Sequence, residues 1–163
     1  MGNRADEIIP VDSEWRAEID RLIEREWAGP MVATNGVLHN TSQAEGFVFL
    51  SSGQLAGYLL YCLEKGECEV LVLHSLAENR GVGSALLRSA VQKAKQGGCG
   101  RIWLVTTNDN VRAVRFYQRF GMELKAVRIG AMDQARASLK PSIPLIGSDG
   151  IPIKHEFEFE MIL

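Results

Sequence analysis

Residues 78–88 read Glu-Asn-Arg-Gly-Val-Gly-Ser-Ala-Leu-Leu-Arg, and this stretch does most to decide the fold. An apolar run at 70–73 precedes it and a helical pattern follows, so we expect a strand, a tight glycine turn and a helix. Gly81 and Gly83 let the backbone approach a ligand with no Cβ in the way. The amide groups of the helix's first turn would face that ligand, and the helix dipole favours negative charge there. The turn therefore predicts a site for a phosphate or pyrophosphate.

Two familiar phosphate-binding loops do not fit this stretch. The dinucleotide fingerprint requires a third glycine at the position that Leu86 occupies. A Walker A loop requires four residues between its glycines and a Gly-Lys-Ser/Thr ending, and the stretch has neither. An unrelated nucleotide-binding fold is therefore not expected.

A second segment, residues 108–122, reads Asn-Asp-Asn-Val-Arg-Ala-Val-Arg-Phe-Tyr-Gln-Arg-Phe-Gly-Met. The two segments together resemble the GNAT family of acyl-CoA-dependent N-acetyltransferases. The first resembles the family's pyrophosphate loop, Gln/Arg-x-x-Gly-x-Gly/Ala. The second resembles its Asn-x-x-Ala-x-x-Phe-Tyr-x-x-x-Gly-Phe signature, in which five of six fixed positions match and Met122 replaces the last aromatic.

The loop departs from the family pattern at its first position, where Glu78 replaces glutamine or arginine. A carboxylate beside a pyrophosphate would repel it. We therefore expect Glu78 to point away from the ligand, or a nearby cation such as Arg80 to offset its charge.

Composition limits the classes of protein to which the chain can belong. A chain of 163 residues suits a single domain, 1–163, and a net charge of −2 with a pI near 5.9 implies no affinity for nucleic acid. No run approaches the roughly 20 apolar residues of a membrane span, and the N-terminus has no apolar signal core. The three cysteines and three histidines form no metal spacing, so we expect reduced thiols, no metal site and a cytoplasmic protein.

The pattern along the chain predicts an α/β fold with mixed α+β character. Strands are expected at 4–10, 47–50, 55–63, 67–73, 102–106, 122–129 and 154–163. Helices are expected at 13–27 with Ser13 as the N-cap, at 81–96, 109–120 and 132–139, whereas 31–45 is expected to be a loop with no more than one short strand. This is the element order of the GNAT-like fold, a mostly antiparallel sheet with one splayed parallel pair, flanked by helices.

The resemblance implies that acetyl-CoA is the co-substrate and where it binds. The pyrophosphate falls to backbone amides of the glycine turn: Asn79, Arg80, Gly81, Val82, Gly83 and Ser84. The pantetheine arm would pair like an added strand with Leu71, Val72 and Leu73, and one of those amides would polarise the thioester carbonyl. Asn110 would bond to the CoA arm, although a residue of its type at a helix start is equally typical of an N-cap.

The resemblance places Tyr117 beside the sulfur, where its phenol would protonate the leaving thiolate; otherwise it is a core aromatic. Two carboxylates are candidates for the base. Glu67 and Glu69 are two residues apart on one strand, so their side chains lie on the same face. By position Glu67 matches the family's base, and Glu69 is nearer the splay. Both would be ordinary surface groups if that face is solvated. His74 is a third candidate, or a surface loop residue.

The acceptor is expected to be a primary amine of a small molecule or a peptide. Its recognition would fall to 28–45 together with Trp27, His39 and Asn40, with the insert 131–153 covering the same cleft. Glu156, Glu158 and Glu160 would suit a cationic acceptor, but are more typical of a solvated edge strand.

Direct transfer is expected because Cys68 and Cys99 have no histidine partner in any recognisable arrangement. Three alternatives stay open: an acyl-CoA-binding sensor that catalyses little, a donor with a longer acyl chain, and a homodimer, since related proteins commonly form dimers.

Overall fold

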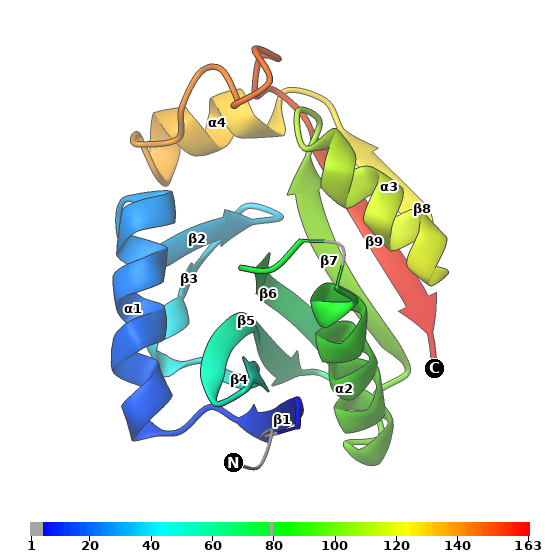
Figure 1. Cartoon of the computed structure of the whole chain (residues 1–163). Coiled ribbons are helices and arrows are strands. Elements are labelled where there is room, and N and C mark those ends of the chain that lie inside the picture. The colour runs from blue at the N-terminus through cyan, green and yellow to red at the C-terminus, as the bar shows by residue number, and fades with distance from the viewer. Residues whose placement is uncertain (1–4, 79) are drawn as a thin grey trace.

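The computed structural model describes residues 5–78 and 80–163, which build a seven-stranded mixed sheet in the order β1-β4-β5-β6-β7-β9-β8 (Figure 1). Every neighbouring pair is antiparallel except β6 and β7, as the sequence predicts. The strands are β1 (Glu7–Pro10), β4 (Glu45–Ser51), β5 (Gln54–Glu64), β6 (Glu67–Ser75), β7 (Arg101–Thr107), β8 (Glu123–Arg128) and β9 (Glu156–Ile162).

Helices cover both faces of this sheet (Figure 1). They are α1 (Ser13–Trp27) on one face, α2 (Val82–Gln96) and α3 (Val111–Phe120) on the other, and α4 (Ala131–Ser138) across one end. The sequence predicts all four within a few residues. The cap of α1 lies one residue earlier than expected, because Asp12 Oδ1 accepts from Trp15 N at 3.1 Å while Ser13 is already helical.

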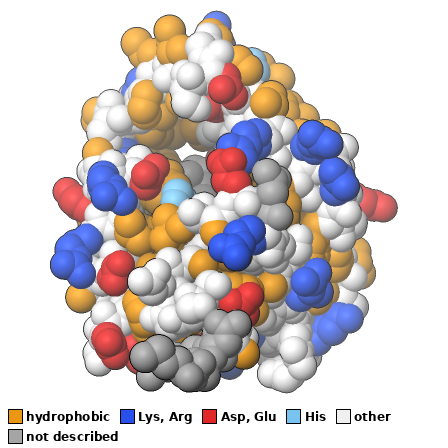
Figure 2. Space-filling view, viewed as in Figure 1, with side chains coloured by type: hydrophobic (Ala, Val, Ile, Leu, Met, Phe, Trp, Pro, Cys, Tyr) orange, Lys and Arg blue, Asp and Glu red, His pale blue; other side chains and the backbone are white. Residues whose placement is uncertain are grey.

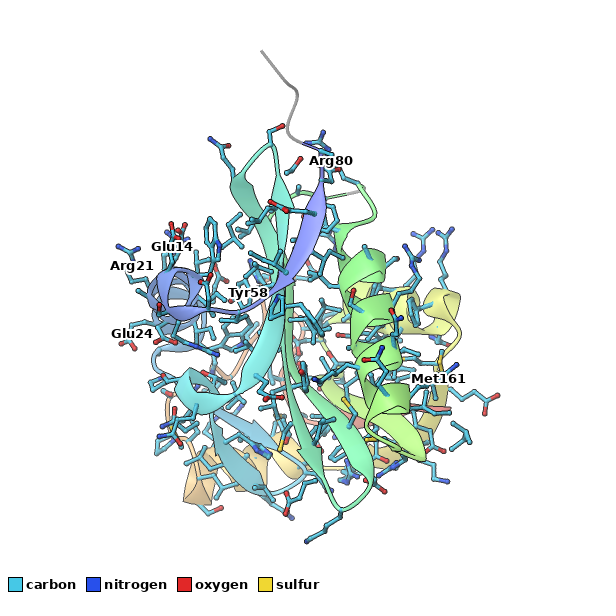
Figure 3. All side chains as sticks on the ribbon, turned by 90° about the horizontal axis from the view of Figure 1, so that it is seen from below. Glu14, Arg21, Glu24, Tyr58, Arg80 and Met161 are labelled. Atoms are coloured by element: carbon cyan, nitrogen blue, oxygen red, sulfur yellow. The ribbon has the colours of Figure 1, made fainter. Side chains whose placement is uncertain are left out.

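The two faces of the sheet bury separate apolar clusters. On β5, Leu59 belongs to the cluster beneath α2, with Leu86 and Ile102, whereas Tyr58 belongs to the cluster beneath α1, with Ile19. This follows from the alternation of side chains along a strand. Figure 3 shows Tyr58 inside the molecule beside the sheet, while charged side chains of α1 such as Glu14 and Arg21 point outward.

The expectation of a loop at 31–45 is wrong. Strands β2 (Met31–Thr34) and β3 (Val37–Asn40) form a hairpin apart from the main sheet, followed by a 3-10 turn at Thr41–Gln43. Asn35 and Gly36 occupy its turn with φ values of +47° and +74°. Asn-Gly is the pair that tolerates two left-handed residues in succession, so the sequence carried a hairpin signal that its weak periodicity concealed.

The expectation of a solvated edge strand at the C-terminus is also wrong. β9 lies between β7 and β8, and Glu156 and Glu158 are only 2% and 5% exposed. Arg128 on β8 contacts both carboxylates, at 2.8 Å from Glu156, and Arg101 on β7 contacts Glu158 at 3.0 Å. These guanidinium groups compensate the buried charges, which is why an alternating Glu–apolar strand can lie inside the sheet.

The segment from α4 to β9 forms an arch over one end of the sheet. Lys140, which follows α4, donates from Nζ to the carbonyl oxygens of Trp27 at 2.6 Å and Met31 at 2.7 Å. Arg136 on α4 donates to the carbonyls of Ile143 and Ile153 and so fixes the returning loop. Figure 2 shows the surface hollowed between this arch and the rest of the molecule.

Candidate active site

The parallel pair β6–β7 opens part-way along its length. Its paired residues are Glu67 with Arg101, Cys68 with Ile102 and Glu69 with Trp103. Beyond Glu69, within the described residues, β6 continues to pair with β5 but no longer with β7. The backbone at 71–73 therefore presents an edge toward the opening, where an extended ligand can add like a strand.

The glycine turn after β6 leads into α2 as expected. Gly81 has φ +74° and is the N-cap of α2, and no side chain caps this end. The amides of Val82, Gly83 and Ser84 precede Ala85, whose amide makes the first helical bond at 3.0 Å to Gly81 O. These first-turn donors are what an anion binds at a helix start.

Arg80 and Asn79 are the remaining residues of the turn that the sequence assigns to the pyrophosphate site. Arg80 is exposed and lies at the turn (Figure 3). Asn79, the remaining predicted contributor to the pyrophosphate site, lies outside the described residues. A Cβ on Gly83 would lie 3.3 Å from Phe116 Cζ, so this glycine also lets α2 approach α3 closely.

Glu78 turns toward α3. Its Oε1 lies 2.7 Å from Arg112 Nη1, and this contact lowers the pKa of the carboxyl. The cation that offsets its charge is therefore Arg112 and not Arg80, the example that we expected from the sequence. Both side chains of the pair are exposed, and the pair links the glycine turn to the start of the second signature segment.

The signature helix α3 contributes two predicted residues. Asn110 caps the helix, with Oδ1 accepting from Ala113 N at 3.1 Å, so the N-cap interpretation holds for its oxygen. Tyr117 is 8% exposed, and its ring centroid lies 5.9 Å from that of Phe159. Burial raises the pKa of the phenol above 10, so Tyr117 carries its proton at neutral pH.

Glu69 lies beneath the β2–β3 hairpin and is 9% exposed. Thr34 Oγ1 donates to Glu69 Oε1 at 2.5 Å. Burial raises the pKa of Glu69 to about 7, with smaller contributions in the same direction from Glu156 and Glu158, and the Thr34 hydroxyl opposes this rise. A carboxylate with a pKa near neutrality can take up and release a proton under ordinary conditions.

Glu67 has a different environment although both carboxylates lie on one cavity wall, as their spacing predicts. Its Oε1 lies 3.0 Å from Arg101 Nε, its Oε2 accepts from the same guanidinium at 3.1 Å, and 41% of its side chain is exposed. The carboxylate of Glu67 is thus held by a permanent cation, whereas Glu69 faces a hydroxyl and an imidazole.

His74 lies on β6 itself and not on a surface loop. Its ring stacks on Tyr58 with centroids 5.6 Å apart and meets Trp27 edge-on at 5.8 Å. Burial lowers the pKa of this imidazole. His74 and Trp27 therefore pack together at the α1 face of the sheet.

Sequence reasoning missed Thr34 as a functional residue and assigned His39 to the acceptor alone. Both belong to the hairpin, and His39 Nε2 lies 3.6 Å from Glu69 Oε2. The Asn-Gly turn was the available signal. A cavity of about 200 Å³ adjoins this group and is lined by Thr34, Asn35, Val37, His39, Cys62, Glu64, Lys65, Glu67, Glu69 and Trp103.

Comparisons with known proteins agree with this geometry. Residues 8–122 match the sequence profile of the Acetyltransferase (GNAT) family. The Bacillus subtilis protein YdhI is 36% identical over 157 residues, which cover 96% of this chain and 98% of YdhI. An IAA acetyltransferase from Bacillus cereus superposes with a TM-score of 0.72 at 18% identity, covering 98% of this chain and all of that one. An Elizabethkingia anophelis GNAT acetyltransferase solved with acetyl-CoA bound gives 0.70 at 15% identity, covering 98% and 99%.

Proposed function

The chain belongs to the GNAT acetyltransferase family, and from this premise we propose that it transfers the acetyl group of acetyl-CoA directly to a primary amine. The observation that carries the proposal is the opening between β6 and β7 beside the uncapped start of α2. Acetyl-CoA is the co-substrate that suits both features. The acceptor is an amine of a small molecule or a peptide. The reaction takes place in the cytoplasm.

The donor is held along β6 and the turn that follows. The pyrophosphate accepts hydrogen bonds from the amides at 82–84, and the pantetheine arm pairs with the β6 edge at 71–73. One β6 amide polarises the thioester carbonyl and stabilises the negative charge that develops on its oxygen. Holding the thioester in this way removes much of the entropic cost of the bimolecular reaction. The Nδ2 group of Asn110 remains a candidate donor to the CoA arm, because its Oδ1 caps α3.

Glu69 is the base in this proposal. It takes a proton from the acceptor's ammonium group, and the neutral nitrogen then attacks the thioester carbon. The carbon–sulfur bond breaks as the tetrahedral intermediate collapses, and Tyr117 gives its phenolic proton to the thiolate. Glu67 is less suited to the role, since its ion pair with Arg101 stabilises the charged form and ties up both oxygens.

Direct transfer is supported by the state of the thiols. Cys68 is buried, and burial raises its pKa to about 12, so it carries its proton and is a poor nucleophile. Cys99 is also buried. An acyl-enzyme would require a thiolate activated by a neighbouring base.

Glu78 was the main reason to consider an acyl-CoA-binding sensor that catalyses little, and its contact in the structure removes that reason. A carboxylate aimed at the pyrophosphate would weaken donor binding, but Glu78 is paired with Arg112. Catalysis is therefore the function that the site supports best.

The first test is a pair of measurements on the whole chain. Saturating acetyl-CoA or CoA is expected to raise the melting temperature, because a ligand at 100 times its dissociation constant adds about 2.7 kcal/mol, whereas NAD and ATP leave it unchanged. Release of CoA from acetyl-CoA is then measured with a panel of primary amines. A melting shift without amine-dependent CoA release would favour the sensor. The absence of a shift would refute the donor site.

A further inference from the structure

The β2–β3 hairpin brings two polar side chains to one buried carboxylate. In its register Val32 lies opposite His39 and Thr34 opposite Val37, so Thr34 and His39 project from the same face. Thr34 contacts Oε1 of Glu69 at 2.5 Å, and His39 Nε2 lies 3.6 Å from Oε2. The two oxygens of the carboxylate thus have separate neighbours, a donor on one and an imidazole on the other.

The imidazole of His39 is somewhat more exposed than the carboxylate of Glu69 that it faces. Among the described residues, Nε2 is buried without a hydrogen-bond partner, although 18% of the side chain is exposed. The same ring lines the cavity of about 200 Å³, whose walls include the exposed residues Val37 and Lys65. Glu69 lines this cavity too, so His39 offers a second and more exposed group from which the proton can leave to water.

We propose that His39 is a proton-relay residue, which takes from Glu69 the proton removed from the acceptor amine and releases it into the cavity. The inference rests on the proposed function and deepens it. The proton moves from the acceptor nitrogen to Glu69 Oε2, from there to His39 Nε2, and then from the imidazolium to water. Glu69 returns to its carboxylate form, and the neutral His39, left with its hydrogen on Nε2, regains the Nδ1–H tautomer by proton exchange with water before the next acceptor binds.

The charges around the pair suit such a transfer. Burial lowers the pKa of His39 below 6.5, and Glu64 on β5 raises it in part, so the ring is neutral near pH 7 and can accept a proton. Burial raises the pKa of Glu69 to about 7, and Glu156, Glu158 and Glu64 act in the same direction. Lys65 and Glu67 also line the cavity, and Arg101 holds Glu67. The imidazolium that forms is therefore acidic, because burial lowers its pKa, and it gives its proton up readily to water.

The distance of 3.6 Å is longer than a hydrogen bond and has to shorten when Glu69 is protonated. A neutral carboxylic acid can donate a hydrogen bond to Nε2. An ionised carboxylate and an Nε2 that carries no hydrogen are both acceptors, so they form no hydrogen bond. Contacts of this kind often tighten only during the reaction.

The test is chemical rescue of His39→Ala. We expect its kcat to fall roughly 100-fold or more with an unchanged KM for acetyl-CoA, as is typical for loss of a proton-transfer group. Imidazole added to a dilute buffer is expected to restore kcat, because it fits the vacated space and carries protons. Pyrazole has the same size but binds a proton far more weakly, and it is expected to restore nothing. Equal rescue by both, or no loss of kcat, would overturn the proposal.

Two controls separate the relay from a packing role. Val37→Ala enlarges the same cavity without removing a titratable group, so added imidazole is expected to leave its kcat unchanged. His39→Gln keeps a polar side chain of similar length that does not take up or release a proton near neutral pH. It is therefore expected to be as slow as His39→Ala even when its melting temperature equals that of the parent. A fast His39→Gln enzyme would refute the relay.

An acceptor-free measurement distinguishes this inference from the proposed function. The imidazole resonances of His39 are followed by NMR as a function of pH in the parent and in Glu69→Gln. Two coupled titration steps are expected in the parent and one in the variant, and identical single-step curves would refute the coupling. If no amine releases CoA from the parent, the proposed function fails whatever the titration shows.

Discussion

The buried charge of Glu69 has a consequence for stability that can be measured without a substrate. Its pKa is about 7 in the folded protein against 4.5 for an ordinary glutamate. An acid that holds its proton more tightly in the folded state favours folding at low pH. The free energy of unfolding therefore falls as the pH rises from 4.5 to 7 and is constant above that. At 1.36 kcal/mol per pKa unit, the span from 4.5 to 7 corresponds to about 3 kcal/mol.

Glu69→Gln removes the free-energy cost of a buried carboxylate charge while keeping the shape of the side chain. Its carbonyl oxygen can still accept from Thr34 Oγ1. We expect parent and variant to have similar free energies of unfolding below pH 4.5, and the variant to be more stable by about 3 kcal/mol above pH 8. Urea unfolding at a series of pH values measures this difference, and subtraction of the two curves cancels the titration of the other carboxylates.

Glu67→Gln is the matched control, because it lies two residues away on the same strand and ends in an ion pair with Arg101. It is expected to gain no stability at high pH. Glu69 does not have a raised pKa if the difference in unfolding free energy between Glu69→Gln and the parent is constant from pH 4 to pH 9, or if this variant is the less stable protein at pH 9.

Three further predictions concern catalysis and the arch. Tyr117→Phe is expected to lower kcat about 100- to 10,000-fold with an unchanged KM for acetyl-CoA, measured by CoA release; an unchanged kcat would mean that Tyr117 only packs in the core. Thr34→Val removes the hydrogen bond that lowers the pKa of Glu69, so the acidic limb of the kcat pH profile should move to higher pH, and a shift to lower pH would contradict the assignment of the base. Lys140→Met removes the two hydrogen bonds that Nζ donates to the part-buried carbonyls of Trp27 and Met31 and should cost about 2 kcal/mol by calorimetry, whereas the same change at exposed Lys154 should cost little.

The local structure of the proposed donor site could be predicted from sequence because its determinants are local. The glycine turn and the start of α2 are contiguous, and the backbone conformation at Gly81 requires a glycine. The position of Asn110 at the start of α3 and the burial of Tyr117 also follow from short patterns. Local physics sets all of these, and the structure agrees with them.

The environment of the base could not be predicted, because it depends on contacts between distant segments. Thr34 and Glu69 are 35 residues apart in the chain, and Glu78 and Arg112 are 34 apart. The burial of Glu158 depends on β9 lying between β7 and β8, and an alternating strand gives the same pattern inside a sheet or at its edge. Only the hairpin had a local signal, in Asn35 and Gly36.

Every step of the proposed reaction depends on acetyl-CoA lying along β6 and ending on the first turn of α2. Amide hydrogen exchange, followed residue by residue with NMR in the presence and absence of saturating acetyl-CoA, measures whether it does. We expect slower exchange at 71–73 and at 82–84, with little change in the β2–β3 hairpin. Unchanged exchange at both segments, with protection confined to another part of the chain, would contradict it.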